Sequence, residues 1–263
     1  MKTLKISLLF LFTASVFFYG CKKDKDDDPA QQTCRVAKVN YFETNGAPSD
    51  SAIYTYTADK VTKVQLSEAN FTLEYNGNNV VRRNYFLSAA SMPNAYDQVT
   101  YNTDGTISRI ENFERVSSNY SSVYRLDFTY TAGKLVKATY NDITNNVATK
   151  EEEYVYTYTG NNITSAVYTD FTGSTPSPQT FTYTYDTNIN YFKKLNSQVF
   201  LIDLLFLDLD GSSLPLIFSG NNVLSLSGNG QSIPLSYTLD TRQNLGEIRL
   251  VNQLFARYTY QCQ

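Results

Sequence analysis

The chain has 263 residues, with 22 Lys and Arg against 25 Asp and Glu, 22 Tyr and 16 Phe, and no His or Trp. The lack of His excludes a Ser-His-Asp or Cys-His catalytic arrangement, and the formal net charge of −3 is not that of a nucleic-acid-binding surface. Abundant Tyr alongside Thr and Asn is typical of exposed or half-exposed β-sheet. We therefore expect a β-rich protein with no nucleic-acid partner.

The N-terminus has the features of an export signal. Lys2 and Lys5 precede an apolar run over residues 8–19 that is too short to remain as a membrane-spanning helix. A small residue directly before Cys21 resembles a bacterial lipobox, which implies cleavage before Cys21 and lipid attachment to its thiol. The alternative is an ordinary secretory signal with an incidental cysteine. We predict a lipoprotein signal peptide over 1–20 and a membrane partner reached through lipid at Cys21.

Residues 21–33 form the next segment, with almost no apolar side chains and a dense block of charge, so they cannot bury enough surface to become ordered. The simplest interpretation is a solvated, disordered tether. An acidic stretch directly after a lipidated cysteine also resembles the surface-export signal of Bacteroidetes-type lipoproteins. That resemblance implies a lipid-anchored outer-membrane protein exposed at the cell surface. We expect no metal at 26–28, because a disordered strip holds no fixed geometry.

Cys34 and Cys262 stand at the two ends of the predicted folded domain, residues 34–263. In an oxidising compartment this pair predicts a disulfide, which requires the two Cα atoms to lie within about 7 Å. The first strand, expected over 34–43, and the last strand would then be neighbours, so the sheet must curl back on itself. Two unpaired buried thiols are the alternative.

A repeated motif predicts a series of β-hairpins. Each copy has an apolar residue, one intervening residue, an aromatic residue, a short turn and an aliphatic residue. The copies span 54–61, 73–80, 99–107, 128–135, 156–163 and 216–223. In Tyr156-Thr157-Tyr158 the alternation places the tyrosines on one face of a strand and the threonine on the other. Gly160 and the two asparagines after it suit a tight hairpin turn.

Several copies carry a second apolar residue three positions after the first aliphatic, as at Val61/Val64 and Ile163/Ala166. Strict alternation would place such a pair on opposite faces, whereas a bulge just after the turn would keep both on one face. Longer polar connections are expected at 88–94, 116–122, 142–148 and 173–178.

The hairpin rhythm stops at Asn188. Apolar residues over 191–209 have helical spacing and predict a buried helix that caps or plugs the sheet, with a pair of strands as the alternative. After Gly211 strands are expected again over 214–226, 233–239, 246–251 and 255–260. The predicted fold class is all-β: an antiparallel meander of repeated β-hairpins, curled into a closed or nearly closed barrel, with one short helix late in the chain.

The hairpins resemble the YD repeats of Rhs-type shell proteins, as in Phe128-Thr129-Tyr130 followed by Gly133-Lys134-Leu135. Nearly the whole mature chain is similar to an uncharacterised Bacteroidetes surface lipoprotein domain described as porin-like in fold. Besides Cys21 and the hairpins, two motifs carry that similarity: Tyr185-Asp186 to Asn190-Tyr191-Phe192, where Tyr191 replaces the usual proline, and Ser219-Gly220-Asn221-Asn222-Val223. The resemblance implies a fold and supplies no activity.

Together these features predict a membrane-tethered extracytoplasmic lipoprotein that is not an enzyme. The sequence has no phosphate-cradling glycine loop, and its cysteines are assigned to lipid and a disulfide. Carboxylates such as Glu151-Glu152-Glu153 could in principle serve glycoside hydrolysis, but consecutive acids on a strand point to alternating faces and usually keep the strand soluble. We expect no catalytic residue, no bound metal and no cofactor.

Two functions remain open. Rows of Tyr suited to stacking on sugar rings favour binding of a glycan or another ligand at the cell surface, although for any single Tyr a place in the core is the simpler explanation. The alternative is a structural or protein-interaction lipoprotein of the outer membrane with no small-molecule ligand. A membrane-spanning porin is disfavoured, because threonines rather than apolar residues occupy the face opposite the tyrosines.

Overall fold

The computed structural model describes residues 34–43, 45–87, 90–195 and 211–262. The chain divides into two units, residues 1–33 and residues 34–263. Cys21, the predicted signal peptide and the predicted tether all fall outside the described residues, so their assignments stay predictions. No helix of the described part is long and apolar enough to cross a membrane.

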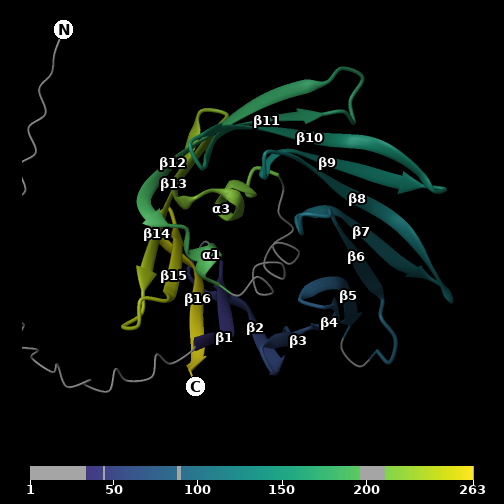
Figure 1. Ribbon diagram of the computed structural model, residues 1–263, viewed down its shortest axis with the longest axis horizontal. Coiled ribbons are helices and arrows are strands. Elements are labelled where there is room, and N and C mark those ends of the chain that lie inside the picture. The colour runs from purple at the N-terminus through teal and green to yellow at the C-terminus, as the bar shows by residue number, and fades with distance from the viewer. Residues whose placement is uncertain (1–33, 44, 88–89, 196–210, 263) are drawn as a thin grey trace, which may run out of the picture. The chain divides into compact units, whose positions relative to one another are not determined.

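The folded unit is built from antiparallel strands. They are β1 (Cys34–Phe42), β2 (Pro48–Thr57), β3 (Lys60–Gln65), β4 (Ala69–Asn76), β5 (Asn79–Leu87), β6 (Ala95–Tyr101), β7 (Ile107–Val116), β8 (Asn119–Thr131), β9 (Lys134–Thr144), β10 (Val147–Thr159), β11 (Asn162–Asp170), β12 (Ser177–Ile189), β13 (Asn221–Gly228), β14 (Gln231–Leu239), β15 (Leu245–Leu250) and β16 (Gln253–Cys262). Each strand pairs with its neighbours in the chain, and β1 pairs with β16, which closes the barrel (Figure 1). The predicted all-β meander and its closure are confirmed.

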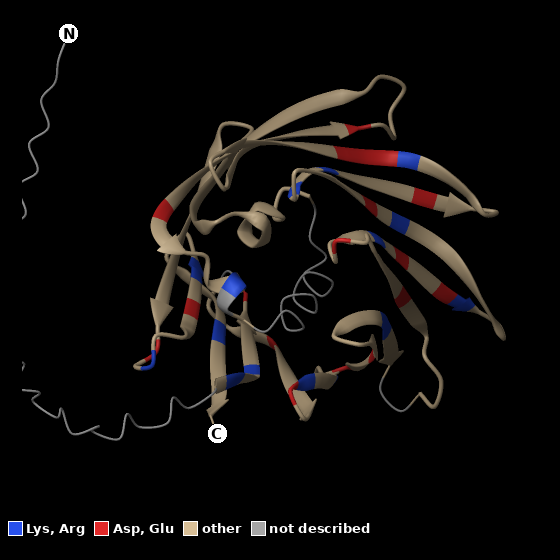
Figure 2. Cartoon of the chain, viewed as in Figure 1, with Lys and Arg blue, Asp and Glu red and all other residues tan. Residues whose placement is uncertain are grey.

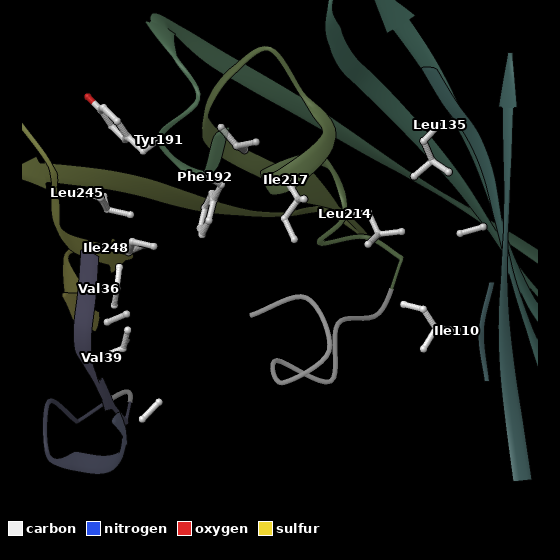
Figure 3. Packing of buried hydrophobic residues seen from close by; sticks show 14 of the residues in the cluster. Val36, Val39, Ile110, Leu135, Tyr191, Phe192, Leu214, Ile217, Leu245 and Ile248 are labelled. Atoms are coloured by element: carbon white, nitrogen blue, oxygen red, sulfur yellow. The ribbon is translucent and has the colours of Figure 1, made fainter. Parts of the chain in front are cut away.

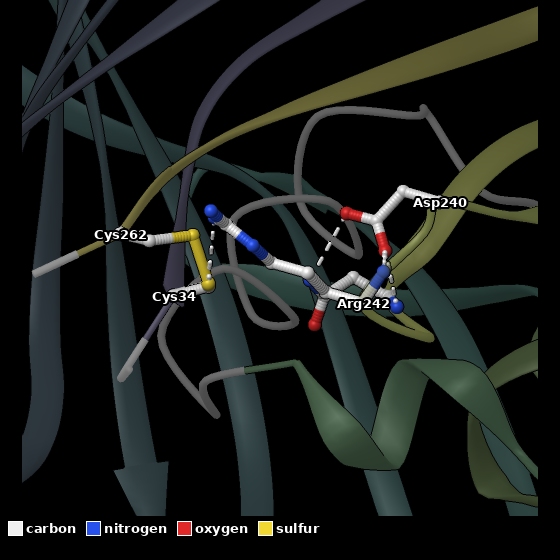
Figure 4. Close-up of a disulfide and its surroundings, with 5 residues drawn as sticks. Cys34, Asp240, Arg242 and Cys262 are labelled. Atoms are coloured by element: carbon white, nitrogen blue, oxygen red, sulfur yellow. Dashed lines mark hydrogen bonds between the residues drawn. A yellow bond between two sulfur atoms is a disulfide. The ribbon is translucent and has the colours of Figure 1, made fainter. Parts of the chain in front are cut away.

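A disulfide joins the two ends of the barrel wall, as predicted. Cys34 and Cys262 are direct partners in the register of β1 and β16, with Cα atoms 4.0 Å apart. Arg242, from the turn between β14 and β15, points its guanidinium at this bond, with Nη1 3.8 Å from the Cys34 sulfur (Figure 4). The closing strand pair is therefore both hydrogen-bonded and covalently fixed.

The predicted bulge after the tight turns is present. Between β2 and β3, Thr55 pairs with Lys63 but Tyr56 pairs with Val61, so one residue of β3 is unpaired. Val61 and Val64 both face inward and are fully buried. The same shift occurs between β4 and β5, β6 and β7, β8 and β9, and β10 and β11. The bulge thus explains why aliphatic residues three apart share the core face.

Two of the predicted long connections are wrong. In both regions, 116–122 and 142–148, the strands extend almost to each other, and only two-residue turns at 117–118 and 145–146 separate them. These turns are possible because Ser117, Asn145 and Asn146 adopt the positive φ that a tight hairpin requires. The strand ends leave longer connections between β5 and β6 and between β11 and β12, as expected at 88–94 and near 173–178.

The predicted hairpin copy at 216–223 is also wrong. Leu216 and Phe218 lie in α3 (Pro215–Phe218), and the sheet resumes only at β13. Pro215 favours this outcome, because proline fits the first turn of a helix, where its missing N–H costs nothing. The predicted helix over 191–209 begins as α1 (Tyr191–Lys194) but stops there, since Leu195 has an extended backbone. Residues 196–210 fall outside the described residues.

The hydrophobic core lies inside the barrel. A wall of sixteen strands is wider than its own side chains can fill. Figure 3 shows Phe192 of α1 and Ile217 of α3 extending into the interior toward wall residues such as Ile248, and all three are buried. The two helices therefore supply core packing that the wall cannot provide.

A group of asparagines holds the helical insertion to the wall. Asn190 is fully buried; its Nδ2 donates to the carbonyls of Leu216 (2.8 Å) and Ser219 (3.0 Å), and its Oδ1 caps α1 by accepting from Phe192 N (2.9 Å). Asn222 accepts from Tyr191 N at 2.7 Å. These contacts give a structural role to the two motifs on either side of the insertion.

Asp186 joins this group from the end of β12. It accepts from Asn222 Nδ2 at 3.0 Å and from Asn188 Nδ2 at 2.8 Å. Burial opposes ionisation of Asp186, but these hydrogen bonds outweigh it and hold the pKa of the carboxyl below its ordinary value. The carboxylate therefore stays charged while it holds the junction together.

One end of the barrel, which we call the tyrosine end, carries the turns at 58–59, 77–78, 132–133 and 160–161. Six tyrosines on strands that run toward this end each donate their hydroxyl to a backbone carbonyl of the preceding strand. The contacts are Tyr56 to Val36 O (2.8 Å), Tyr75 to Val61 O (2.6 Å), Tyr101 to Val80 O (2.9 Å), Tyr237 to Val223 O (2.9 Å), Tyr260 to Leu245 O (2.9 Å) and Tyr185 to Ile163 O. We call this set the tyrosine ladder.

The basic residue of the motif completes the ladder. Lys134 donates to the carbonyl of Gly160 at 2.5 Å and lies over the ring of Tyr158, 5.2 Å from its centroid. Lys60 makes the matching contacts with Gly77 O and the ring of Tyr75. The β2–β3 and β8–β9 hairpins are thus each linked to the next hairpin through aromatic, basic and turn residues.

Candidate functional site

The opposite end of the barrel, which we call the far end, carries the turns at 66–68, 117–118, 145–146 and 251–252. Toward this end a polar pocket of about 540 Å³ lies on the inner face of β2 to β8. Glu68 and Leu66 at the turn between β3 and β4 form part of its edge. Its volume lies within the range of small-molecule sites in proteins.

A row of cross-strand partners forms one wall of this polar pocket. Arg83 on β5 pairs with Asp97 on β6, Asp97 with Asn112 on β7, and Asn112 with Tyr124 on β8. Direct partners in antiparallel strands share a face, so the four side chains stand side by side on the inside of the barrel. Four adjacent strands thus place a guanidinium, a carboxylate, an amide and a phenol in line.

The row is hydrogen-bonded at its buried end. Arg83 Nε and Nη2 lie 2.7 and 2.5 Å from Asp97 Oδ2, and Asn112 Nδ2 donates to Asp97 Oδ1 at 2.8 Å. Arg83 and Asp97 are only 7% and 2% exposed. The Arg83 guanidinium also lies over the ring of Phe71, 4.8 Å from its centroid. The ion pair is therefore rigidly placed, with no water shell of its own.

One donor of this buried pair is unused. Arg83 Nη1 is buried and has no hydrogen-bond partner within the described part of the chain. An orphaned buried donor costs about 1–3 kcal/mol, so such groups in native proteins call for an explanation. Because this nitrogen is itself buried, it does not present a free donor at the surface of the polar pocket.

Charge and aromatic surface define what the polar pocket can accept. Among the described residues that line it, Asp50, Glu68, Asp97 and Glu114 stand against the single cation Arg83, a formal charge of −3. Tyr85 and Tyr124 also line it, and Tyr124 is 44% exposed. This combination disfavours anions and suits a neutral or cationic polar ligand with a flat face.

Sequence analysis placed several candidate residues correctly and missed others. The disulfide cysteines lie at the tyrosine end, away from the polar pocket. Glu152 faces inward and accepts from Tyr168, whereas Glu153 faces outward toward Lys137, so these acids do alternate between faces. Of the tyrosines in the predicted hairpin motifs, Tyr56, Tyr75 and Tyr101 belong to the ladder, and Tyr54 and Tyr156 are buried in the core. This supports the simpler interpretation of them as structural.

Arg83, Asp97 and Asn112 were missed, although the repeat contained a signal for Arg83. The position three residues after the first aliphatic holds Val64, Ile110, Ala138 and Ala166 in other hairpins, and it holds Arg83 in the β4–β5 hairpin. A charged residue at a position that is apolar in the other hairpins breaks the packing pattern. Such a break indicates a candidate functional site.

Metal chemistry finds no support in this geometry. Among residues 34–43, 45–87, 90–195 and 211–262, no group of three or more Cys, Asp or Glu side chains is arranged to hold a metal ion. The acids of the polar pocket are instead spread around its wall.

Comparison with models of known protein families found no match, and neither did comparison with curated proteins. Among solved structures, a porin-like protein from Bacteroides uniformis matches with a TM-score of 0.52 at 12% identity, over 86% of this chain and 98% of that one. A porin-like protein from Bacteroides vulgatus matches with a TM-score of 0.33 at 14% identity, over 86% and 98%. The TcdB2-TccC3 structure matches 80% of this chain and 12% of its own, with a TM-score of 0.34 at 14% identity. Of these three, the first has a TM-score above 0.5, and it shows that this chain has a fold similar to that of a Bacteroides porin-like protein.

Proposed function

We propose that this protein is a non-catalytic, lipid-anchored outer-membrane lipoprotein exposed at the cell surface, and that it binds a neutral saccharide in the polar pocket. The observation that carries the ligand proposal is the Arg83–Asp97–Asn112 row, which lines the polar pocket together with Tyr85 and Tyr124. Fixed, planar polar groups beside aromatic rings match a sugar, which offers hydroxyls at its edge and C–H groups on its face.

The exterior of the barrel supports a location in water. Threonines at positions opposite the inward tyrosines, such as Thr55, Thr129 and Thr184, are exposed. Ion pairs cross the outer face as well, including Arg109 with Asp127 at 2.7 Å and Arg257 with Glu247 at 2.9 Å. Figure 2 shows charged residues spread along β7 to β10. Lipid-facing strands would need apolar residues at these positions.

A lipid on Cys21 would be joined to the barrel wall at Cys34, which lies at the tyrosine end, through the 12 residues between the two cysteines.

The saccharide proposal is tested by glycan-array screening followed by calorimetry. We expect binding of neutral or amino-bearing oligosaccharides and none of uronic-acid or sulfated ones, because the polar pocket carries a formal charge of −3. Tyr124→Ala should weaken binding about tenfold through loss of ring stacking. Val155→Ala, at an equally exposed position on the outer face of β10, should leave affinity unchanged.

The competing proposal is a structural or protein-interaction lipoprotein without a small-molecule ligand. No binding across neutral, amino and acidic glycans would remove the saccharide proposal and favour this alternative. The anchor is tested separately: mass spectrometry of the membrane-extracted protein should show a diacylated Cys21 at the N-terminus. An unmodified Cys21, or a mature N-terminus elsewhere, would contradict it.

A further inference from the structure

A second pocket of about 260 Å³ lies inside the barrel, on the inner face of β1 and β12 to β16. Its floor includes Phe192 of α1 and Leu216 of α3. Leu226 and Ile233, next to the turn at 229–230, form part of its edge, so it lies toward the same far end as the polar pocket. We call it the apolar pocket.

The lining of the apolar pocket is unlike that of the polar pocket. None of its described lining residues is charged, and most are Leu, Ile, Val or aromatic. Two of its tyrosines already use their hydroxyls: Tyr183 donates to Ser212 O and Tyr237 to Val223 O, both at 2.9 Å. Water held here would find few partners, so an apolar group would displace it favourably.

The two pockets meet at the first strand pair of the barrel. Tyr41 on β1 lines the apolar pocket, and Asp50 on β2 lines the polar pocket. Tyr41 and Asp50 are direct partners in the antiparallel register, so their side chains stand next to each other on the inner face. A polar and an apolar binding surface thus adjoin at one residue pair.

We infer that the apolar pocket is a second ligand site and that it binds the alkyl chain of an amphipathic ligand whose saccharide head occupies the polar pocket. The evidence for the alkyl site is the lining of the apolar pocket alone. The identity of the head group rests on the proposed function. The combination describes a glycolipid-like molecule rather than a free sugar.

The probe is a series of n-alkyl β-D-glucosides from methyl to octyl, each titrated into the full-length protein below its micelle concentration. Each methylene that enters the apolar pocket should raise affinity roughly fourfold, until the pocket is filled and the rise stops. A flat dependence of affinity on chain length would overturn the inference.

Two substitutions test whether the dependence of affinity on chain length comes from the apolar pocket. Ile233→Glu places a charge at the partly exposed edge of the apolar pocket, and Leu226→Trp fills part of its volume. Both should abolish the chain-length dependence, with the circular dichroism spectrum confirming that each variant is folded. Val167→Glu is the matched control: Val167 is 37% exposed on the outer face of β11 and Ile233 is 38% exposed. Chain-length dependence that survives both edge variants would also overturn the inference.

The experiment separates failure of this inference from failure of the saccharide proposal. If methyl glucoside and the array glycans do not bind, yet longer chains gain affinity and lose it in Ile233→Glu, the alkyl site stands and the saccharide head is wrong. If glycans bind but chain length has no effect, the polar pocket stands alone and the alkyl site is wrong.

Discussion

The two ends of the barrel use similar residues for different purposes. At the tyrosine end, Tyr75 is one of a set of residues whose hydroxyls are all committed to backbone carbonyls. At the far end, Tyr85 and Tyr124 line a pocket beside a buried ion pair. The comparison shows that the residues repeated from hairpin to hairpin link neighbouring hairpins to each other. The residues that differ from the repeat, such as Arg83, line the candidate binding pocket. Substitutions at the tyrosine end should therefore change stability, and those at the far end should change binding.

Removal of the disulfide should have the largest effect on stability. Replacing Cys34 and Cys262 with Ser frees a loop of 228 residues at the tyrosine end, for which the chain-entropy model gives about 5.5 kcal/mol. Urea denaturation of the double variant measures the loss. Far-end ligand affinity under native conditions should be unchanged, since β1 and β16 remain hydrogen-bonded. A loss of stability below about 1 kcal/mol would show that strand pairing alone closes the barrel.

Asn190→Ala should cost about 3 kcal/mol. The substitution leaves the carbonyls of Leu216 and Ser219 without their donor and removes the cap of α1. Thr187→Ala, three residues earlier at an exposed position of β12, serves as the control and should cost about 0.5 kcal/mol. Equal losses in the two variants would mean that the buried amide does not hold the insertion to the wall.

Removing one tyrosine hydroxyl at each end of the barrel allows the effects on the free energy of unfolding to be compared. Tyr75→Phe removes a ladder hydrogen bond to Val61 O and should lower the free energy of unfolding by about 1 kcal/mol. Tyr85→Phe at the far end should change it by less than about 0.5 kcal/mol. Thermal or urea denaturation of both variants gives the comparison, and the reverse order would refute a structural role for the ladder.

High pH should act on the tyrosine end first while leaving the protein unaffected at neutral pH. Burial raises the pKa of Tyr101 to about 12 from its ordinary 10, and burial also raises the pKa of Tyr75, Tyr130 and Tyr237. A raised pKa contributes stability that is complete below pH 10 and lost as pH rises through about 12. Tyrosinate absorbance should therefore rise in step with unfolding. Full titration of all tyrosines near pH 10 in a still-folded protein would contradict this.

Local sequence patterns determined most of the wall. Alternation of Tyr and Thr set the faces of strands such as β10, turn residues such as Gly160 set the hairpins, and the spacing of Val61 and Val64 indicated the bulge. The two terminal cysteines indicated closure. These features are readable because hairpins and their turns depend on residues close together in the chain.

Tertiary structure was needed to place the insertion and to assemble the candidate site. Leu216 and Phe218 fit the hairpin motif, but Pro215 and the space inside a wide barrel made them helical. Arg83, Asp97 and Asn112 lie on three strands and become one row only through the register between those strands. The local sequence determines which face of the sheet a side chain takes. The register between strands determines which side chains become neighbours, and the chemistry of a site depends on those neighbours.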